Sequence, residues 1–445
     1  MNEIRTRFAP SPTGLLHIGS LRTALYAYAF AKSKKGDFIL RIEDTDQRRN
    51  VAGAKEKIGG MLKLFGIVWD EYYIQSERLD LYREAAKKLL AEGHAFYCQC
   101  QARNAKKEGY SKELRDPCRG KNLTSGAIKL KVPADGRISF RDFVVGKEIS
   151  WESSAVADAT LLKSDGFPTY HLAAVVDDHG MRISHVFRGH DWMPSTPIHL
   201  LVYRYLGFEP PQIGHLTDIL DPEGGKLSKR KGSVSCEEFL TQGFLPEAIL
   251  NFIMLLGWAP KDNREIFTLP DFVANFQKGS LQVANPIFNR QKLDWFNGHY
   301  LRQKSDADLL QSIKPFAPKG AAADLIAKTI PLIKDRITKL SDYEPFAGFF
   351  FAEPKVDKKL LTALAKEQLT KAISVLEKIT DWKKAEIEKQ LQGLVKKENW
   401  QMGEFFMNFR LAIAGSKFTP PITDSVAIMG RAKTLPRLKL VLELL

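Results

Sequence analysis

The chain has 445 residues, 44% hydrophobic and 27% charged, a composition typical of a globular protein with about two to four domains. It contains no stretch of roughly twenty apolar residues, which excludes a membrane-spanning helix, and its four cysteines are too few for a disulfide framework. The net charge is +14, and more than half of this surplus lies in the C-terminal third, which predicts either a polyanionic partner or a solvated basic surface.

Strand-like and helix-like segments alternate in the first part of the chain. Strands are expected at 6–9 ("TRFA") and 37–42 ("DFILRI"), and amphipathic helices at 21–35, 51–66 and 79–93. This β-α-β-α order predicts a parallel sheet with right-handed crossovers.

The pattern changes between residues 96 and 184. Short strand-like pieces lie between Gly, Pro and Asp turns, at 127–133, 137–151 and 160–179. They predict an α+β insertion between two halves of the sheet. The α/β pattern then returns with a strand at 183–189, and after about residue 240 the chain is nearly all helical.

The segment "RFAPSPTGLLHIGSLRTAL" places a Pro- and Gly-rich turn between the first strand and the first helix. In this layout the helix N-terminus faces the carboxyl edge of the sheet, where free N–H groups attract phosphate. Gly19 allows a flat base or a phosphate to approach the backbone, and His17 can donate a hydrogen bond to a phosphate oxygen. Taken alone, the segment is also compatible with a Pro-rich turn that caps an ordinary helix.

A second segment, "DPEGGKLSKRKG" at 221–232, is a Gly-rich basic loop that follows a strand-like stretch. It lacks the spacing of a P-loop. A basic loop suits a reaction in which negative charge develops on a phosphoryl group. Taken alone, this segment could be an ordinary solvated basic loop. Its occurrence together with the first segment, in the other half of the same sheet, makes a shared phosphate-binding role the better interpretation.

These segments resemble the signatures of class I aminoacyl-tRNA synthetases, with "HIGS" at 17–20 for HIGH and "KLSKR" at 226–230 for KMSKS. The wider pattern is similar to bacterial-type glutamyl-tRNA synthetases, through "RFAPSPTG", "RIEDTD", "PTYHLA", "VVDDH", "STPIHLL", "GFLPEAILNF" and "FNRQKLDWFNGHY". The chain departs from that family's pattern at Ser20, in "RGHDW" at 188–192, in the Lys-Arg-Lys after Ser228, and at Ala174.

The resemblance implies a Rossmann-like parallel-sheet catalytic domain with an α+β insertion and an all-α C-terminal anticodon-binding part. The expected domains are 1–95 and 185–240 for the two catalytic halves, 96–184 for an acceptor-end-binding insertion, 241–310 for stem contact and 311–445 for the anticodon. It also implies a cytoplasmic monomer that uses ATP, Mg²⁺, L-glutamate and tRNA, with no membrane partner.

The implied reaction joins glutamate to tRNA through glutamyl-adenylate, with no covalent enzyme nucleophile. Arginines suit the carboxylates of glutamate, and an acid suits its ammonium group. The family's glutamate contacts fall on Arg7, Ser11, Glu43, Tyr170 and Arg188. Taken singly, Arg7 and Glu43 could form a mere surface pair.

The ATP contacts implied by the resemblance fall on six residues. They are His17, Gly19, Asp191, Trp192, Lys226 and Lys229. The catalytic residues among them are His17, Lys226 and Lys229, and Lys229 is expected to contact the α-phosphate in the transition state. For Trp192, a position in the core is an equally good interpretation.

Three cysteines lie close together in the predicted insertion. Cys98, Cys100 and Cys118 predict a structural zinc site, with Tyr110 or a residue that folds in as the fourth ligand. Free thiols at a decayed site are the alternative, and Cys236 is expected to play no part.

Three other functions remain open on the sequence. The same chemistry could charge glutamine tRNA or both tRNAs, and the contacts that discriminate them are expected with the anticodon, in the helical C-terminal part. A tRNA-independent nucleotidylyltransferase would not need the basic helical part. A non-catalytic RNA-binding relative would be free to lose His17, Gly19, Lys226 or Lys229, and all four are present.

Overall fold

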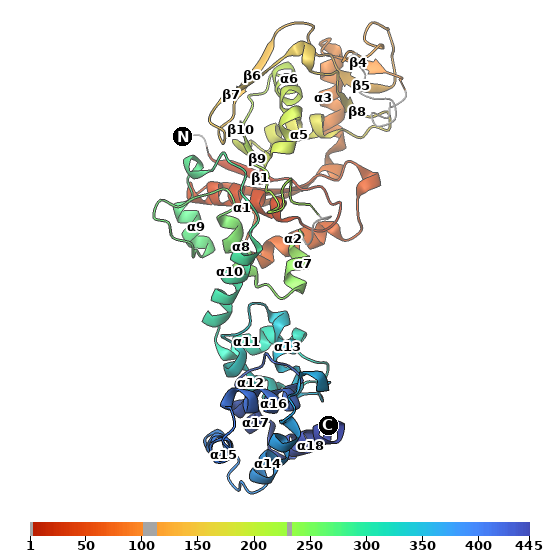
Figure 1. Ribbon diagram of the computed structural model, residues 1–445. Coiled ribbons are helices and arrows are strands. Elements are labelled where there is room, and N and C mark those ends of the chain that lie inside the picture. Colours follow the sequence, from red (N-terminus) through yellow and green to blue (C-terminus); the bar gives the residue numbers. More distant parts are fainter. Residues whose placement is uncertain (1–2, 101–113, 229–233) are drawn as a thin grey trace. The chain divides into compact units, whose positions relative to one another are not determined.

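The computed structural model describes residues 3–100, 114–228 and 234–445. The chain divides into two compact units, one made of residues 1–239 and 249–289 and the other of residues 240–248 and 290–445. Figure 1 labels the helices and strands of both units.

The first unit is built on a five-stranded sheet in the order β10-β9-β1-β2-β3, and every neighbouring pair is parallel. The strands are β1 (Arg5–Phe8), β2 (Asp37–Ile42), β3 (Glu71–Ile74), β9 (His185–Gly189) and β10 (Gln212–Leu216). Strand β1 is central and wholly buried, with Thr6 opposite Phe38 of β2 and His185 of β9. The predicted Rossmann-like sheet is confirmed.

Helices cover both faces of this sheet. Figure 1 shows α1 (Ile18–Ser33) on one side of the strands, and α5 (Tyr170–Gly180) and α6 (Thr196–Leu206) on the other. The remaining helices before residue 289 are α2 (Ala54–Leu64), α3 (Leu79–Ala91), α7 (Cys236–Thr241), α8 (Pro246–Met254) and α9 (Leu269–Asn275).

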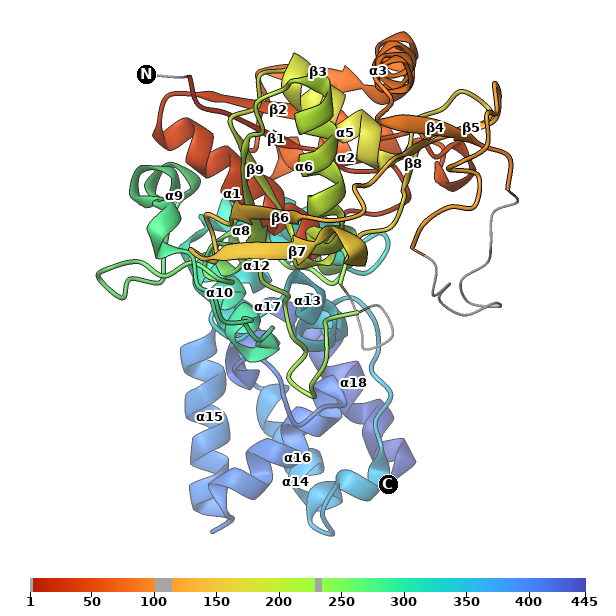
Figure 2. The same cartoon turned by 90° about the horizontal axis from the view of Figure 1, so that it is seen from above.

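The predicted insertion is confirmed as α+β, but one of its elements differs. An antiparallel sheet contains β4 (Ala95–Cys98), β5 (Ala127–Leu130) and β8 (Thr160–Leu162), and it lies to one side of the parallel sheet in Figure 2. A separate hairpin is formed by β6 (Arg137–Arg141) and β7 (Glu148–Glu152).

The strand-like interpretation of residues 160–179 is wrong beyond β8. Strand β8 ends at Leu162 and the chain turns back, so that Pro168 pairs with Leu162; from Tyr170 the chain is helical, because the following apolar run packs as a helix. Leu172, Ala173 and Val175 are buried in one hydrophobic cluster with residues of α3 and α6. A short apolar run does not by itself distinguish a buried helix from a buried strand.

The second unit contains helices and no strand, and all of its residues are described. Its helices are α10 (Arg290–Gln303), α11 (Asp306–Ile313), α12 (Ala323–Ile333), α13 (Tyr343–Ala347), α14 (Ala365–Leu376), α15 (Lys384–Lys397), α16 (Met402–Ala414), α17 (Ile422–Met429) and α18 (Arg431–Leu444). Helix α14 packs against α15, α16 and α18. The predicted all-α C-terminal part is confirmed. Among the described residues, no helix is both long enough and apolar enough to cross a bilayer.

Candidate active site

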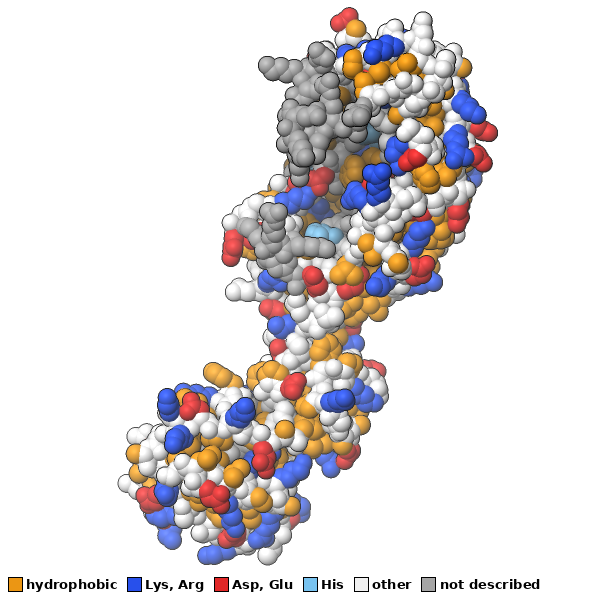
Figure 3. Space-filling view, turned by 90° about the vertical axis from the view of Figure 1, so that its right-hand side faces the viewer, with side chains coloured by type: hydrophobic (Ala, Val, Ile, Leu, Met, Phe, Trp, Pro, Cys, Tyr) orange, Lys and Arg blue, Asp and Glu red, His pale blue; other side chains and the backbone are white. Residues whose placement is uncertain are grey.

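A cleft of about 590 Å³ opens at the carboxyl ends of the parallel strands. It is lined by every predicted glutamate- or ATP-binding residue that the structure describes, namely Arg7, Ser11, His17, Gly19, Glu43, Tyr170, Arg188, Asp191, Trp192 and Lys226. The predicted Lys229 lies outside the described residues. Figure 3 shows basic and histidine side chains around a hollow in the first unit. The fold therefore brings together residues from both halves of the sheet.

The described lining of this cleft is more basic than acidic. Its cations are Arg7, Arg22, Arg49, Arg188 and Lys226, and its carboxylates are Glu43, Asp191 and Asp218. Arg22, Arg49 and Asp218 were not predicted from the sequence. A positive excess in a concave site favours anionic ligands.

Both signature segments contribute residues to the lining of the cleft. The His17 side chain caps α1, with Nδ1 accepting the Gly19 N–H at 3.0 Å. The Ile18 N–H donates to Val234 O at 2.9 Å, so the start of α1 is joined to the chain just beyond the basic loop. Because Nδ1 of His17 accepts, a neutral ring carries its proton on Nε2, which is then a hydrogen-bond donor.

Lys226 stands between two carboxylates at this edge of the sheet. Its Nζ lies 2.9 Å from Asp218 Oδ1 and also contacts Asp191. Burial lowers the pKa of Lys226, but Asp191 and Asp218 outweigh this effect and raise it above the ordinary value. The ammonium group is therefore charged, and Asp191, predicted as an ATP contact, pairs with it.

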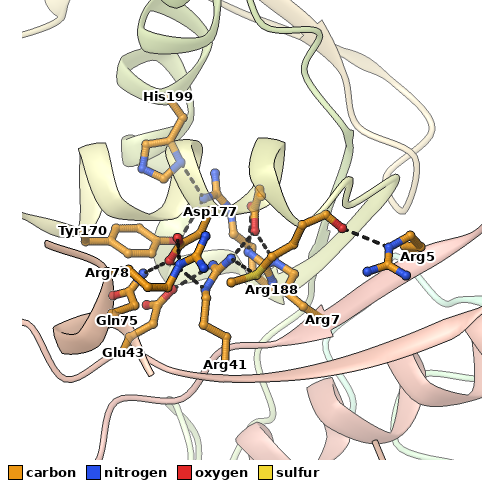
Figure 4. A network of polar contacts seen from close by, with 12 residues as sticks. Arg5, Arg7, Arg41, Glu43, Gln75, Arg78, Tyr170, Asp177, Arg188 and His199 are labelled. Carbon is orange, nitrogen blue, oxygen red and sulfur yellow. Dashed lines mark hydrogen bonds and ion pairs between the residues drawn. The ribbon is translucent and has the colours of Figure 1, made fainter. Parts of the chain in front are cut away.

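A buried network of charges holds Arg7 and Glu43 in place (Figure 4). Arg41 is fully buried, with Nη1 2.6 Å from Asp178 Oδ1 and Nη2 2.9 Å from Glu43 Oε1. Arg7 Nε lies 3.1 Å from the same Asp178 oxygen. The alternative of a surface pair is wrong, because Arg7 and Glu43 pair with buried partners, not with each other.

The pKa shifts in this network have opposite directions. Burial raises the pKa of Asp178, but the cations of Arg7 and Arg41 outweigh burial and lower it. For Glu43, burial prevails over Arg41 and Arg7, and its pKa is raised. A ligand ammonium group beside Glu43 would favour its ionised form.

Arg188, at the end of β9, anchors the opposite side of the cleft. Its Nη1 donates to the Tyr170 hydroxyl at 3.1 Å, and the Tyr170 and Trp192 rings are 4.3 Å apart. Trp192 is 45% exposed, so the core position considered for it is wrong. Ala174 is buried in α5 and does not line the cleft.

The three predicted zinc ligands come together in the insertion. Candidate ligand atoms of Cys98, Cys100, Asp116 and Cys118 all lie within 4.8 Å of one another. Three thiols and one carboxylate at such separations fit a tetrahedral zinc ion. Asp116, missed from the sequence, also lies 2.5 Å from the Lys129 ammonium. Tyr110, the fourth ligand predicted by name, lies outside the described residues.

Comparison with known families agrees with this geometry. Residues 3–295 match the family described as "tRNA synthetases class I (E and Q), catalytic domain", and residues 308–442 match the family described as "Anticodon binding domain". The chain belongs to the class I tRNA synthetases.

Individual class I tRNA synthetases match the chain over its length. A "Glutamate--tRNA ligase" of Dehalococcoides mccartyi is 40% identical, covering 99% of this chain and 97% of the relative, and one of Treponema denticola is 37% identical, covering 98% of each. The crystal structure of a glutamate tRNA ligase from Elizabethkingia meningosepticum, in complex with its amino acid, has a TM-score of 0.83 at 32% identity and covers 99% of each chain.

Proposed function

We propose that this synthetase joins L-glutamate to glutamate tRNA in two steps. The glutamate α-carboxylate attacks the α-phosphorus of ATP, the bond to the β-phosphate breaks, and diphosphate leaves. A ribose hydroxyl at the tRNA terminus then attacks the carbonyl of glutamyl-adenylate, giving up its proton as AMP leaves. The observation that carries this proposal is one basic cleft lined by residues of both signature segments, by Glu43 and by the two arginines Arg7 and Arg188.

The glutamate part of the cleft separates charges in the way the substrate requires. Arg7 and Arg188 bind carboxylates, and Glu43 pairs with the ammonium group, while Ser11 and the Tyr170 hydroxyl add hydrogen bonds. Because Asp178 and Arg41 already fix Arg7 and Glu43, little ordering is left to occur when the substrate binds.

The ATP part of the cleft uses the start of α1 and the basic loop. His17 and Gly19 accommodate the nucleotide at the helix N-terminus, Asp191 and Trp192 add contacts from β9 onward, and Lys226 with Lys229 stabilises phosphoryl charge. Mg²⁺ would accompany ATP and neutralise phosphate charge. The three carboxylates in the described lining already pair with Arg41 or Lys226, so we assign it no protein ligand.

The tRNA would contact the helical parts of the chain. We assign stem contact to residues 241–310, anticodon contact to residues 311–445, and acceptor-end contact to the insertion at 96–184. The match of residues 308–442 to an anticodon binding domain supports the second assignment.

Charging assays test this function and its principal alternative. Glutamate, ATP and Mg²⁺ are incubated with purified glutamate tRNA, glutamine tRNA or no tRNA, and glutamyl-tRNA is measured. Acceptance by glutamate tRNA is expected. Acceptance by glutamine tRNA alone would replace the proposed substrate, and full ATP–diphosphate exchange without tRNA would favour a nucleotidylyltransferase.

The cysteine cluster supports a structural zinc ion held by Cys98, Cys100, Cys118 and Asp116. Such an ion would tie β4 to the segment before β5. Protein purified without a metal-affinity column should contain about one equivalent of zinc. Less than about a tenth of an equivalent would contradict this site.

A further inference from the structure

A buried carboxylate of the β6–β7 hairpin reaches the parallel sheet beneath the cleft. Asp142 Oδ1 accepts the N–H groups of Val144 and Val145, at 2.8 and 3.0 Å. Its Oδ2 lies 3.1 Å from the His215 backbone nitrogen and 2.6 Å from His215 Nδ1. Neither the Asp142 nor the His215 side chain is exposed to solvent.

The hairpin is held tightly at this position. A Cβ atom at Gly214 would lie only 2.6 Å from the Phe143 ring and from Val144, so the neighbouring strand needs glycine there. The Phe143 ring also packs edge-on against Phe187 of β9, with centroids 4.9 Å apart. Asp142 is therefore placed by packing as well as by its hydrogen bonds.

The contact with Asp142 selects one tautomer of His215. An ionised carboxylate only accepts hydrogen bonds, so His215 Nδ1 carries the proton. In the neutral ring Nε2 then presents a lone pair, and Arg188 Nε donates to it at 3.0 Å. Burial, together with Arg188, lowers the pKa of His215 despite Asp142, in agreement with a neutral ring.

This contact orients the guanidinium group that lines the cleft. Arg188 Nη2 donates to Thr196 Oγ1 at 2.7 Å, and Nη1 donates to the Tyr170 hydroxyl. Arg188 and Tyr170 line the cleft, whereas His215 and Asp142 do not. The hydrogen-bonded series Asp142–His215–Arg188 thus connects the insertion to the residues proposed to bind glutamate. Only Arg188 of these three lines the cleft.

We propose that Asp142 and His215 are positioning residues for glutamate recognition, in which Asp142 fixes the His215 tautomer that accepts from Arg188. This inference rests on the proposed contact between Arg188 and glutamate. It assigns to the insertion a part in amino-acid binding, because Asp142 belongs to the hairpin, whereas Arg188 belongs to the sheet.

The first test is Asp142→Asn. The amide NH₂ of asparagine can donate to His215 Nδ1, which moves the ring proton to Nε2 and points that N–H at the Arg188 Nε–H. The KM for glutamate should rise about 10- to 100-fold, since displacement of a positioned group by roughly 1 Å can cost 10²-fold. The KM for ATP should stay within about twofold. Asp135→Asn, an exposed change in the same insertion, is the matched control and should change neither KM.

The second test asks whether Asp142 acts through His215. Phenylalanine at position 215 can neither accept from Arg188 nor donate to residue 142, so it cannot relay a change at Asp142. In the His215→Phe background, Asp142→Asn should therefore raise the KM for glutamate by less than about twofold. An undiminished effect in that background would overturn the positioning role.

The tautomer itself can be measured without activity. Long-range ¹H–¹⁵N spectra of histidine-labelled wild-type protein should show the His215 proton on Nδ1, with the signal assigned by its loss in His215→Phe. A proton on Nε2 in the wild-type protein would overturn the inference even if Asp142→Asn failed to fold.

Arg188→Lys separates this inference from the proposed function. If Arg188→Lys leaves the KM for glutamate unchanged, the proposed glutamate contact is wrong. If Arg188→Lys raises that KM but Asp142→Asn does not, the contact stands and the positioning role is overturned. A rise in both variants, with the expected wild-type tautomer, supports both.

Discussion

Replacing Arg41 with Met should lower the free energy of unfolding of the first unit by about 3–5 kcal/mol, because it leaves one buried carboxylate without a cation. Arg41 lies within 4 Å of three carboxylates, at 2.6 Å from Asp178, 2.9 Å from Glu43 and 3.8 Å from Asp177. Asp178 would keep Arg7, and Asp177 would keep Arg78 at 2.9 Å. Glu43 would keep no ion pair among the described residues, so the cost is that of one broken buried pair.

The same change should make stability depend on pH in a defined direction. Burial already raises the pKa of Glu43 against Arg41 and Arg7, and removing Arg41 raises it further. A carboxyl whose pKa is higher in the folded state costs stability as the pH rises above the unfolded value of about 4.3. The free energy of unfolding that Arg41→Met loses relative to the wild-type protein should therefore be smaller at pH 5 than at pH 8.

Scanning calorimetry at both pH values measures this effect. A loss of 3–5 kcal/mol in the first unit corresponds to a melting temperature lower by roughly 5–9 °C at pH 8. Arg48→Met, at an exposed arginine nearby, is the control and should shift the transition by less than about 2 °C. A deficit below about 1 kcal/mol, or one that is equal at both pH values, would refute the assignment of Arg41 as the buried counter-ion of Glu43.

Three further changes test other parts of the structure. Gly214→Ala should cost about 1–3 kcal/mol, seen as a lower melting temperature, because the new Cβ would overlap Phe143; unchanged stability would mean that the hairpin packs less closely than described. Lys229→Ala should slow tRNA-dependent ATP–diphosphate exchange roughly 10²–10³-fold while ATP binding falls much less, and an equal loss in both would make the loop a ground-state binding element. Cys100→Ser should remove most of the bound zinc measured by metal analysis, whereas Cys236→Ser should retain it; zinc retained in both variants would place the ion elsewhere.

Much of the architecture could be predicted from local pattern. The parallel sheet follows from alternating strand and helix periodicities, and the two signature segments can be recognised because each is continuous in the chain. Strand ends of a parallel sheet share one edge, so Arg7, Glu43 and Arg188, which lie at or just beyond strand ends, come near one another. The all-α C-terminal part likewise follows from its helical periodicity.

The partners of those residues could not be predicted in the same way. Asp178 contacts Arg7 and Arg41 across 171 and 137 residues of sequence, and Asp142 contacts His215 across 73. Asp178 lies in a segment that the sequence pattern predicts as a strand. In the structure this segment is helix α5, from which Asp178 contacts Arg7 of β1 and Arg41 of β2. No local periodicity encodes such pairings, because they depend on which elements pack together.

The sequence by itself therefore determined the class of fold, the two segments of the cleft and the residue types suited to its charged substrates. Only the tertiary structure decided which of those residues are buried, which counter-ion pairs with each one, and that Asp116 lies beside the three cysteines and Asp142 beside His215. The physical reason is that hydrophobic periodicity is read along the chain, whereas the energy of a buried charge is set by neighbours that packing brings from distant segments.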